Sequence, residues 1–305
     1  MIPHTARREL EELLGKRARF DAPLSRYTSL RVGGPAAALV TPRDRAELSG
    51  VLATCTRYRL RHTVLGAGFN SLFRDGAFEG VVIQLGRLRR LEARPGGGLR
   101  AEAGVSHSQV TNFCIQHGLA GLEFGAGVPG SVGGWLAMNA GLPGREMKDV
   151  VGEIEVMSPT GEHVKHLGRD SVHFVYRALR GLAPGSIILS VLFAVSISSP
   201  AKVKAEVEGW LAKRADTQPL DVPSCGSVFK NPRGDFAGRL IEAAGLKGLR
   251  IGGAQISPVH ANFIANVGQA RASDVLALID EAQRAVRAHS GRKLEPEVRI
   301  LGNPA

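Results

Sequence analysis

The segment from Gly121 to Gly141 restricts the fold most, because seven of its 21 residues are glycine. Glycine loses more backbone entropy on folding than any other residue, so this density disfavours an ordinary helix or strand. We therefore expect an irregular, glycine-lined stretch of backbone that can lie against an extended ligand. Residues 125–130 match the dinucleotide pattern G-x-G-x-x-G. We predict that this is not a Rossmann loop, because Pro129, Gly133 and Gly134 should keep the third glycine from opening a helix.

A second glycine loop, residues 66–72, directly follows a predicted strand at 63–65. Backbone N–H groups in such a loop can converge on an anion such as a phosphate. A plain tight turn is the alternative for a single loop of this kind. In the first loop, we expect Ser131 and Asn139 to be free to hydrogen-bond phosphates or polar ring edges of the same ligand.

The length of 305 residues predicts about two domains, and 44% hydrophobic residues are enough for real cores. Three cysteines with no C-x-x-C spacing predict neither a disulfide framework nor a thiol-rich metal site, and they fit a reducing compartment. We find no secretory signal, and the longest apolar-rich run, residues 187–197, is too short to cross a bilayer. We therefore expect a cytoplasmic protein without a metal.

The net charge of +11 and the isoelectric point near 10.1 raise nucleic acid as a possible partner. However, Arg and Lys are scattered along the chain, aromatic residues are only 5%, and no nucleic-acid-binding motif occurs. A basic surface equally suits an enzyme whose ligands carry diphosphates. An arginine-rich host proteome is a further explanation. We expect neither a nucleic-acid partner nor a membrane partner.

Periodicity and turn residues predict a mixed helix and strand protein. We expect helices at 5–16, from Thr41-Pro42 onward, and at 106–118, 203–214, 237–244 and 273–289, with strands at 63–65, 81–83, 154–156 and 187–195. Residues 95–98 predict a hairpin connection, and residues around Ser224 predict a loop. Ser198-Ser199-Pro200 breaks the pattern and predicts a domain boundary.

Several segments occur in a fixed order and together carry more information than any single loop. They are residues 28–36, 66–72 with 75–76, 121–141, 224–232, 252–257, 260–263 and 294–299. This set covers nearly the whole chain and resembles the UDP-N-acetylenolpyruvoylglucosamine reductase family, also called UDP-N-acetylmuramate dehydrogenase. No extra loop with a second tyrosine is present in the C-terminal part, so the chain resembles the shorter, type II form.

The resemblance implies an α+β protein with an FAD-binding fold of the vanillyl-alcohol-oxidase (PCMH) type. Two N-terminal α/β lobes, 1–66 and 67–199, would be followed by an α+β substrate-binding domain, 200–305. NADPH would reduce the FAD, which would then reduce the enolpyruvyl group of UDP-N-acetylglucosamine enolpyruvate to give UDP-N-acetylmuramate for peptidoglycan. We expect a monomer. The alternatives are another FAD oxidoreductase of the same fold and a non-catalytic nucleotide-binding module.

Hydride delivery to the terminal alkene carbon leaves negative charge on the neighbouring carbon and its carboxylate. The chemistry needs a cation or an acid near the carboxylate and a proton donor near the carbon. The resemblance implies the first role for Arg177 and Glu297 and the second for Ser227. Without the resemblance, these residues would be interpreted as a surface residue, a strand ion pair and a turn hydroxyl.

The resemblance also implies two sets of binding residues. The cofactor set is Arg31, Gly33, Gly34, Gly66, Ala67, Gly68, Phe69, Asn70, Ser71, Gly127, Val128, Pro129, Gly130, Ser131, Gly133, Gly134, Asn139, Ala140 and Gly141. The substrate set is Tyr176, Lys230, Asn231, Gln255, His260 and Asn262. A structural role is an equal alternative for His260. The sequence departs from the family pattern twice, with Phe69 and Leu179 at positions where serine is usual.

Overall fold

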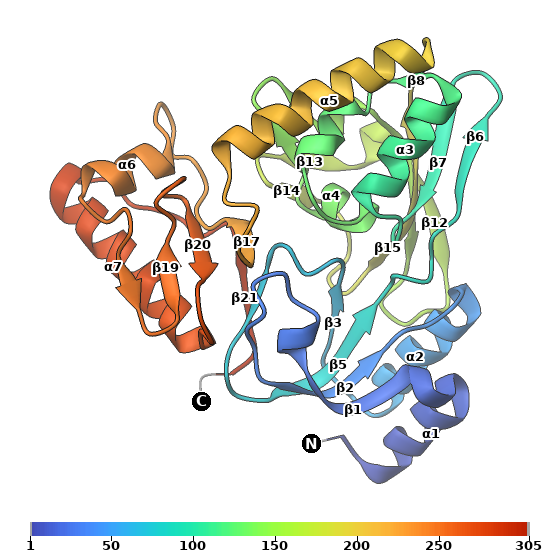
Figure 1. The fold of residues 1–305 in the computed structure, drawn as a ribbon. Coiled ribbons are helices and arrows are strands. Elements are labelled where there is room, and N and C mark those ends of the chain that lie inside the picture. Colours follow the sequence, from blue (N-terminus) through green and yellow to red (C-terminus); the bar gives the residue numbers. More distant parts are fainter. Residues whose placement is uncertain (1, 304–305) are drawn as a thin grey trace. The chain divides into compact units, whose positions relative to one another are not determined.

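The computed structural model describes residues 2–303 as two compact units (Figure 1). Unit 1 contains residues 2–20, 38–67 and 80–214. Unit 2 contains residues 21–37, 68–79 and 215–303. The division into lobes 1–66, 67–199 and 200–305 stays a prediction. No helix within residues 2–303 combines the length and the apolar character that crossing a membrane requires.

Unit 1 contains five α-helices within the described residues. They are α1 (His4–Leu14), α2 (Arg45–Arg57), α3 (His107–His117), α4 (Val132–Ala137) and α5 (Pro200–Thr217), which runs across the division. Side-chain caps begin α2 and α3. The helix predicted at 106–118 is confirmed as α3: the capping box of Ser106 with Gln109 starts it, and Gly118 ends it in the left-handed conformation. The predicted start of α2 at Thr41-Pro42 is wrong. The carboxylate of Asp44 accepts the N–H of Glu47 and caps the helix there instead.

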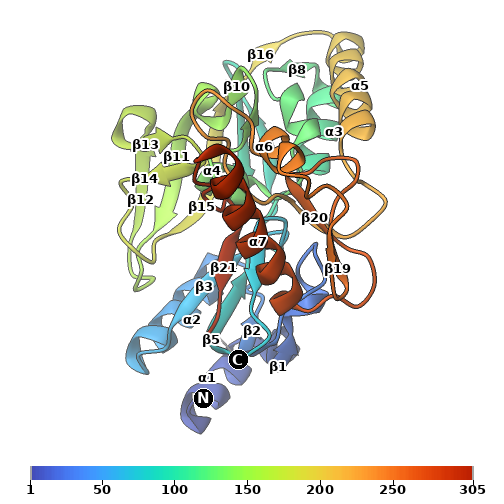
Figure 2. The same ribbon diagram turned by 90° about the vertical axis from the view of Figure 1, so that its left-hand side faces the viewer.

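One sheet of unit 1 has the order β1-β2-β5-β3. Its strands are β1 (Ala18–Pro23), β2 (Pro35–Val40), β5 (Phe78–Gln84) and β3 (His62–Leu65), and β1, β2 and β5 cross the division between the units. β3 and β5 are parallel. Leucines of α1 and α2 pack on Val81 and Ile83 of β5, so both helices lie beside this sheet (Figures 1 and 2).

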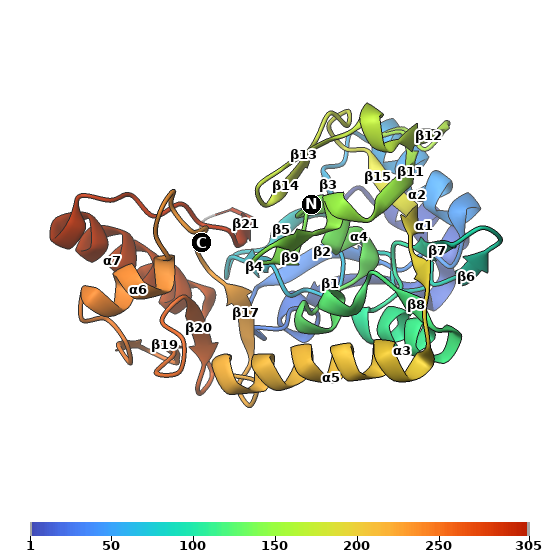
Figure 3. The same cartoon turned by 90° about the horizontal axis from the view of Figure 1, so that it is seen from above.

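The second sheet of unit 1 is antiparallel throughout, with the order β12-β11-β15-β7-β6. Its strands are β12 (Val164–Gly168), β11 (Val151–Met157), β15 (Ile187–Ala194), β7 (Gly98–Glu102) and β6 (Leu91–Arg94). Its core includes Val191, Phe193 and residues of α3, α4 and α5, and α5 lies beside α3 (Figure 3). A Rossmann loop belongs to a parallel sheet, so this antiparallel sheet agrees with our rejection of the G-x-G-x-x-G match.

The glycine segment is more regular than we predicted. It holds a 3-10 turn, Glu123–Gly127, and the short helix α4, which includes Gly133 and Gly134. The side chains of Val132, Trp135 and Leu136 are buried in the core, and this packing outweighs the entropic cost of the two glycines. Gly133 also has a steric reason, because a Cβ there would lie 2.9 Å from the Cβ of Ala103.

Two short hairpins and a two-stranded pairing complete unit 1. They are β9 (Gly141–Leu142) with β10 (Arg145–Glu146), β13 (His173–Val175) with β14 (Ala178–Arg180), and β8 (Leu119–Ala120) with β16 (Ser196–Ile197). All three pairings are antiparallel. The predicted hairpin connection at 95–98 is confirmed between β6 and β7.

A buried carboxylate ties α2 to the antiparallel sheet. Glu155 in β11 accepts hydrogen bonds from Arg45 at 2.6 Å and from the hydroxyl of Ser190 at 2.7 Å. Burial raises the pKa of Glu155, but these hydrogen bonds outweigh it, and the pKa lies below its usual value.

Unit 2 contains a sheet with the order β17-β20-β19-β18 and two helices. The elements are β17 (Ser224–Ser227), β20 (Phe263–Asn266), β19 (Ala254–Ile256), β18 (Arg250–Ile251), α6 (Ala237–Ala243) and α7 (Ala272–Ser290). β21 (Arg299–Leu301) pairs in parallel with β4 (Ser71–Phe73). The predicted loop at Ser224 is wrong, because residues 224–227 pair with β20 as a strand with a shift in register.

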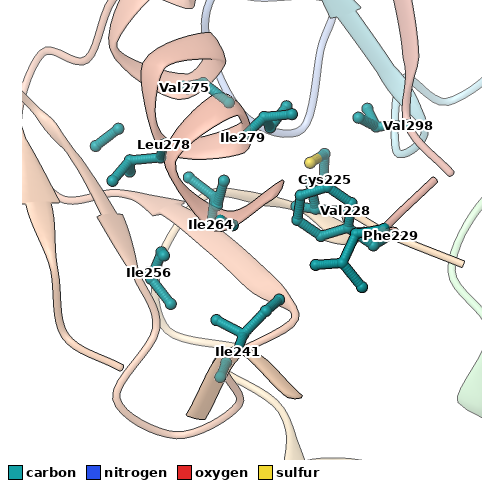
Figure 4. Close-up of a cluster of buried hydrophobic side chains, with 14 of the residues drawn as sticks. Cys225, Val228, Phe229, Ile241, Ile256, Ile264, Val275, Leu278, Ile279 and Val298 are labelled. Carbon is teal, nitrogen blue, oxygen red and sulfur yellow. The ribbon is translucent and has the colours of Figure 1, made fainter. Parts of the chain in front are cut away.

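The core of unit 2 lies between α7 and its sheet (Figure 4). Leu278 and Ile279 of α7 face Ile256 and Ile264 of the strands. The long C-terminal helix is therefore confirmed. Its buried face includes Leu278, whereas Leu276 is only partly buried.

Candidate active site

The glycine loop before α4 is held by backbone contacts in unit 1. The N–H of His107 donates to the carbonyl of Gly130 at 3.0 Å, and the indole of Trp135 donates to the carbonyl of Val128 at 3.0 Å. Gly130 has φ +134°, a conformation that side chains rarely adopt. The loop is therefore a fixed strip of backbone.

Gly66 and Ser131 lie against each other at this strip. A Cβ on Gly66 would lie 2.6 Å from the hydroxyl oxygen of Ser131. Ser131 precedes α4, but its hydroxyl makes no capping hydrogen bond, so it can serve a ligand. A glycine-rich strip with one available hydroxyl fits an extended dinucleotide such as FAD.

A histidine of this region, His107, lies near Arg214 of α5. Burial lowers the pKa of His107, and the nearby guanidinium of Arg214 lowers it further. A basic group of α5 thus acts on the residue that holds Gly130. This pair was not predicted from the sequence, because nothing local links position 107 to position 214.

Tyr176 and Arg177 form the two-residue turn between β13 and β14. Arg177 has φ +56°, and its side chain is only 18% exposed. One guanidinium nitrogen, Nη2, donates to the carbonyl of Gly141 at 3.2 Å, and Nη1 lies 3.9 Å from Oε1 of Glu146. The guanidinium also stacks on the ring of Tyr176, 5.0 Å from its centre. Arg177 is therefore a held side chain and not the surface residue of the alternative interpretation.

Asn139 is fully buried and has φ +40°. Its Nδ2 donates to Oε2 of Glu146 at 3.0 Å and to the carbonyl of Val175 at 3.1 Å, while its Oδ1 accepts the N–H of Lys148 at 3.0 Å. Contrary to our expectation, this side chain is therefore not free, and a contact of Asn139 with the cofactor stays a prediction. Asn139 holds the chain immediately before the Tyr176–Arg177 turn.

In unit 2, hydrogen bonds bring two distant segments of the sequence together. The N–H of Glu297 donates to the carbonyl of Val228 at 2.7 Å, and the N–H of Lys230 donates to the carbonyl of Glu295 at 2.9 Å. The segment with Ser227 and Lys230 therefore runs beside the segment with Glu297. The ammonium of Lys230 also lies 2.5 Å from a carboxylate oxygen of Glu295.

Two asparagine side chains fix this arrangement. Asn262, 4% exposed, donates to the carbonyl of Phe229 at 2.8 Å and accepts its N–H at 2.9 Å. Asn70 donates to the carbonyl of Glu297 at 3.2 Å. Both ends of the Asn262 carboxamide bond to Phe229, and its contact with sugar or base stays a prediction. The side chain of Asn70 has a positioning contact, and its contact with a cofactor stays a prediction.

The other predicted substrate residues of unit 2 also make contacts within the protein. Asn231 accepts the N–H of Ala237 at 3.0 Å, and Gln255 donates to the carbonyl of Gly248 at 3.0 Å. Nδ1 of His260 accepts the N–H of Asn262, and burial lowers the pKa of His260. These contacts support the structural alternative for His260, and a substrate contact stays a prediction for all three.

Three glycines of the predicted cofactor set, Gly33, Gly34 and Gly68, have no space for a side chain within unit 2. A Cβ on Gly34 would lie 2.2 Å from the carbonyl oxygen of Asp75, and one on Gly68 would lie 2.3 Å from that of Tyr27. Gly33, at φ +124°, would meet Phe73 at 2.9 Å. Among the remaining cofactor residues, Ser71 is buried in β4, Phe69, Val128, Pro129 and Ala140 are half-buried, and Arg31 and Ala67 are exposed. Their contacts with FAD stay predictions.

The comparisons with known proteins cover nearly the whole chain. A family model described as UDP-N-acetylenolpyruvoylglucosamine reductase, C-terminal domain, matches residues 218–301, and an FAD binding domain model matches residues 36–166. The UDP-N-acetylenolpyruvoylglucosamine reductase of Geobacter sulfurreducens is 44% identical over 93% of both chains. That of Geobacter metallireducens is 45% identical over 95% of this chain and 96% of its own. The chain belongs to the UDP-N-acetylenolpyruvoylglucosamine reductase family.

Solved structures agree with membership in this reductase family. The crystal structure of UDP-N-acetylenolpyruvylglucosamine reductase from Thermus caldophilus matches with a TM-score of 0.79 and 35% identity, over 93% of this chain and 98% of that one. An alkyldihydroxyacetonephosphate synthase matches with a TM-score of 0.50 and 17% identity, over 65% of this chain and 41% of that one, which shows the fold alone. The predicted family, the FAD-binding fold and the class of FAD-dependent oxidoreductase are confirmed.

Proposed function

We propose that this chain uses NADPH and FAD to reduce the enolpyruvyl group of UDP-N-acetylglucosamine enolpyruvate, giving UDP-N-acetylmuramate. The hydrogen bond from Glu297 to Val228 carries the proposal, because it sets the acid beside the segment of the proton donor Ser227. We further propose that the chain acts as a monomer in the cytoplasm, as part of peptidoglycan synthesis. Its charge of +11 would draw in NADPH and the nucleotide sugar, which are both polyanions.

The residues have separate tasks in this reaction. Bound FAD would supply an acceptor for the hydride of NADPH and a donor for the alkene. The guanidinium of Arg177 and the carboxyl group of Glu297 stabilise the charge that develops on the substrate carboxylate. The hydroxyl of Ser227 gives its proton to the carbon next to that carboxylate. A serine hydroxyl is a weak acid, so water or a neighbouring group must restore its proton quickly.

Binding of the two ligands would use the residues of both predicted sets. The glycine strip and the hydroxyl of Ser131 would hold FAD by its diphosphate and ring edges. Phe69 cannot supply the side-chain hydrogen bond of the serine that is usual there, but the backbone N–H groups of its loop remain. Tyr176, Lys230, Asn231, Gln255 and His260 would contact the nucleotide sugar, with the ammonium of Lys230 near an anionic group.

The test separates the two half-reactions under anaerobic conditions. Purified flavoprotein is mixed with NADPH, and the loss of the flavin absorption band is followed. UDP-N-acetylglucosamine enolpyruvate is then added, and the return of the band is measured. We expect both steps in the native chain. In Ser227→Ala we expect the first step alone, because the proton donor is missing.

Ser224→Ala is the matched control, because Ser224 lies on the same strand and the contact it makes uses its backbone carbonyl, which accepts from Ser29. We expect both steps in this variant. Protein purified without flavin would refute the central proposal. Loss of the band without its return would keep the FAD chemistry and reject this substrate. Equal loss of both steps in Ser227→Ala would reject the proton-donor role.

A further inference from the structure

We propose that Asn139, Gly141 and Glu146, the Arg177 cradle, are positioning residues that hold the guanidinium of Arg177 in its working orientation. This inference rests on the proposed function, in which Arg177 receives the substrate carboxylate. All three residues belong to unit 1, as Arg177 does, and they lie within one short stretch that includes the β9–β10 hairpin.

The backbone gives the first reason. Arg177 and Asn139 both lie in the left-handed region, at φ +56° and +40°. A non-glycine residue is uncommon there, and such conformations persist where the surroundings determine them. Arginine gains no local hydrogen bond from this conformation, unlike asparagine. The strain at Arg177 therefore indicates a turn that neighbouring residues keep in place.

The hydrogen bonds give the second reason. The side-chain nitrogen Nδ2 of Asn139 donates to the carbonyl of Val175, at the start of the turn, and to the carboxylate of Glu146. Glu146 in turn lies 3.9 Å from Nη1 of Arg177. The carboxamide thus fixes both the backbone before the arginine and the carboxylate beside its charge. Since Asn139 is fully buried, it cannot exchange these partners for water.

Gly141 supplies the third contact and has a steric reason to be glycine. Its carbonyl accepts Nη2 of Arg177 at 3.2 Å. Gly141 pairs with Glu146 across the hairpin, and a Cβ on Gly141 would lie 2.2 Å from the carbonyl oxygen of Arg145. The hairpin can therefore close only with glycine here. The cradle contacts two nitrogens of one planar group, which fixes the plane in which the guanidinium meets a carboxylate.

The experiment uses the flavoprotein and the two half-reactions. Asn139→Asp keeps the size of the side chain but turns its donor, which faces Glu146 and Val175, into a repelling oxygen. Glu146→Gln keeps the shape and removes the charge beside Arg177. For both variants we expect flavin reduction by NADPH within about twofold of the native rate. We expect reoxidation by the enolpyruvyl substrate to slow about 10- to 100-fold, the loss that a misplacement on the order of 1 Å can cause.

Lys148→Met is the matched control, because the ammonium of Lys148 lies 2.9 Å from Oε2 of Glu146 on the exposed surface. We expect both half-reactions of this variant to stay within about twofold of the native rates. A role in stability alone would lower the flavin content and slow both half-reactions together in Asn139→Asp and Glu146→Gln. That result would overturn the inference.

A double-mutant cycle shows whether Glu146 acts through Arg177. If it does, adding Glu146→Gln to Arg177→Ala slows reoxidation no further. An equal slowing in both backgrounds would overturn the inference. Slow reoxidation in Arg177→Ala with native rates in both cradle variants would reject the cradle and keep the proposed function. Native reoxidation in Arg177→Ala would reject the role of Arg177, and the cradle with it.

Discussion

Replacing Asn262 by alanine should strongly destabilise unit 2. The side chain bonds to both the N–H and the carbonyl of Phe229, a residue that is 2% exposed. In Asn262→Ala both groups stay buried without these partners, and each such group costs about 1–3 kcal/mol. We therefore expect the free energy of unfolding to fall by roughly 2–6 kcal/mol. The backbone of Asn262 still accepts the N–H of Val228, so the strand pairing itself should remain.

Urea unfolding followed by far-UV circular dichroism measures this loss, and hydrogen exchange of the peptide 224–231 locates it. Faster exchange should be concentrated at Phe229, because local opening becomes easier there. Gln255→Ala is the comparison, since Gln255 is half-buried and makes one hydrogen bond, to the carbonyl of Gly248. For Gln255→Ala we expect a loss of roughly 1 kcal/mol, the contribution of a single hydrogen bond. A loss for Asn262→Ala that lies within about 0.5 kcal/mol of the loss for Gln255→Ala would refute the reasoning.

Other predictions concern close backbone contacts, acid stability and thiol reactivity. Gly34→Ala should abolish or severely lower the yield of folded protein, because its Cβ would overlap the carbonyl of Asp75, whereas Gly86→Ala has open space and should fold normally. Because the pKa of Glu155 is lowered in the folded chain, its contribution to stability is present above its unfolded pKa of about 4.5 and is lost as the pH falls through the folded value. Glu155→Gln should therefore weaken the fall in melting temperature between about pH 6 and pH 3, measured by calorimetry. Burial raises the pKa of the Cys225 thiol to about 12. Iodoacetamide at about pH 8 should therefore alkylate Cys225 only after denaturation, and mass spectrometry measures this alkylation.

Local signals in the sequence predicted elements whose ends depend on local chemistry. The helix predicted at 106–118 is confirmed as α3, because its caps at Ser106 and Gly118 are decided within a few residues. The helix α4 could not be found this way. Its glycines argue against a helix, and it forms because Trp135 and Leu136 are buried against distant strands.

The candidate site shows the same limit. Family resemblance named Arg177, Ser227 and Glu297, and the FAD-binding fold that it implied is confirmed. The roles of Asn139 and Asn262 were not predictable from the residues. An asparagine next to glycines, or directly before a strand, is as well suited to binding a ligand as to binding the protein's own backbone. Only the distant partners Val175 and Phe229 show that these side chains bind the protein's own backbone.

The pairing of β21 with β4 imposes an order on folding during synthesis. Ser71 leaves the ribosome long before its partner Arg299 is made. Residues 21–37 and 68–79 likewise cannot complete their contacts within unit 2 until residues 215–303 have been synthesised. The residues of unit 1 all precede residue 215, so unit 1 can begin to form while translation continues. Unit 2 should therefore fold late and slowly, since its contacts span most of the chain. During that delay β4 offers an unpaired edge, so its neighbourhood is where newly made chains should depend most on chaperones.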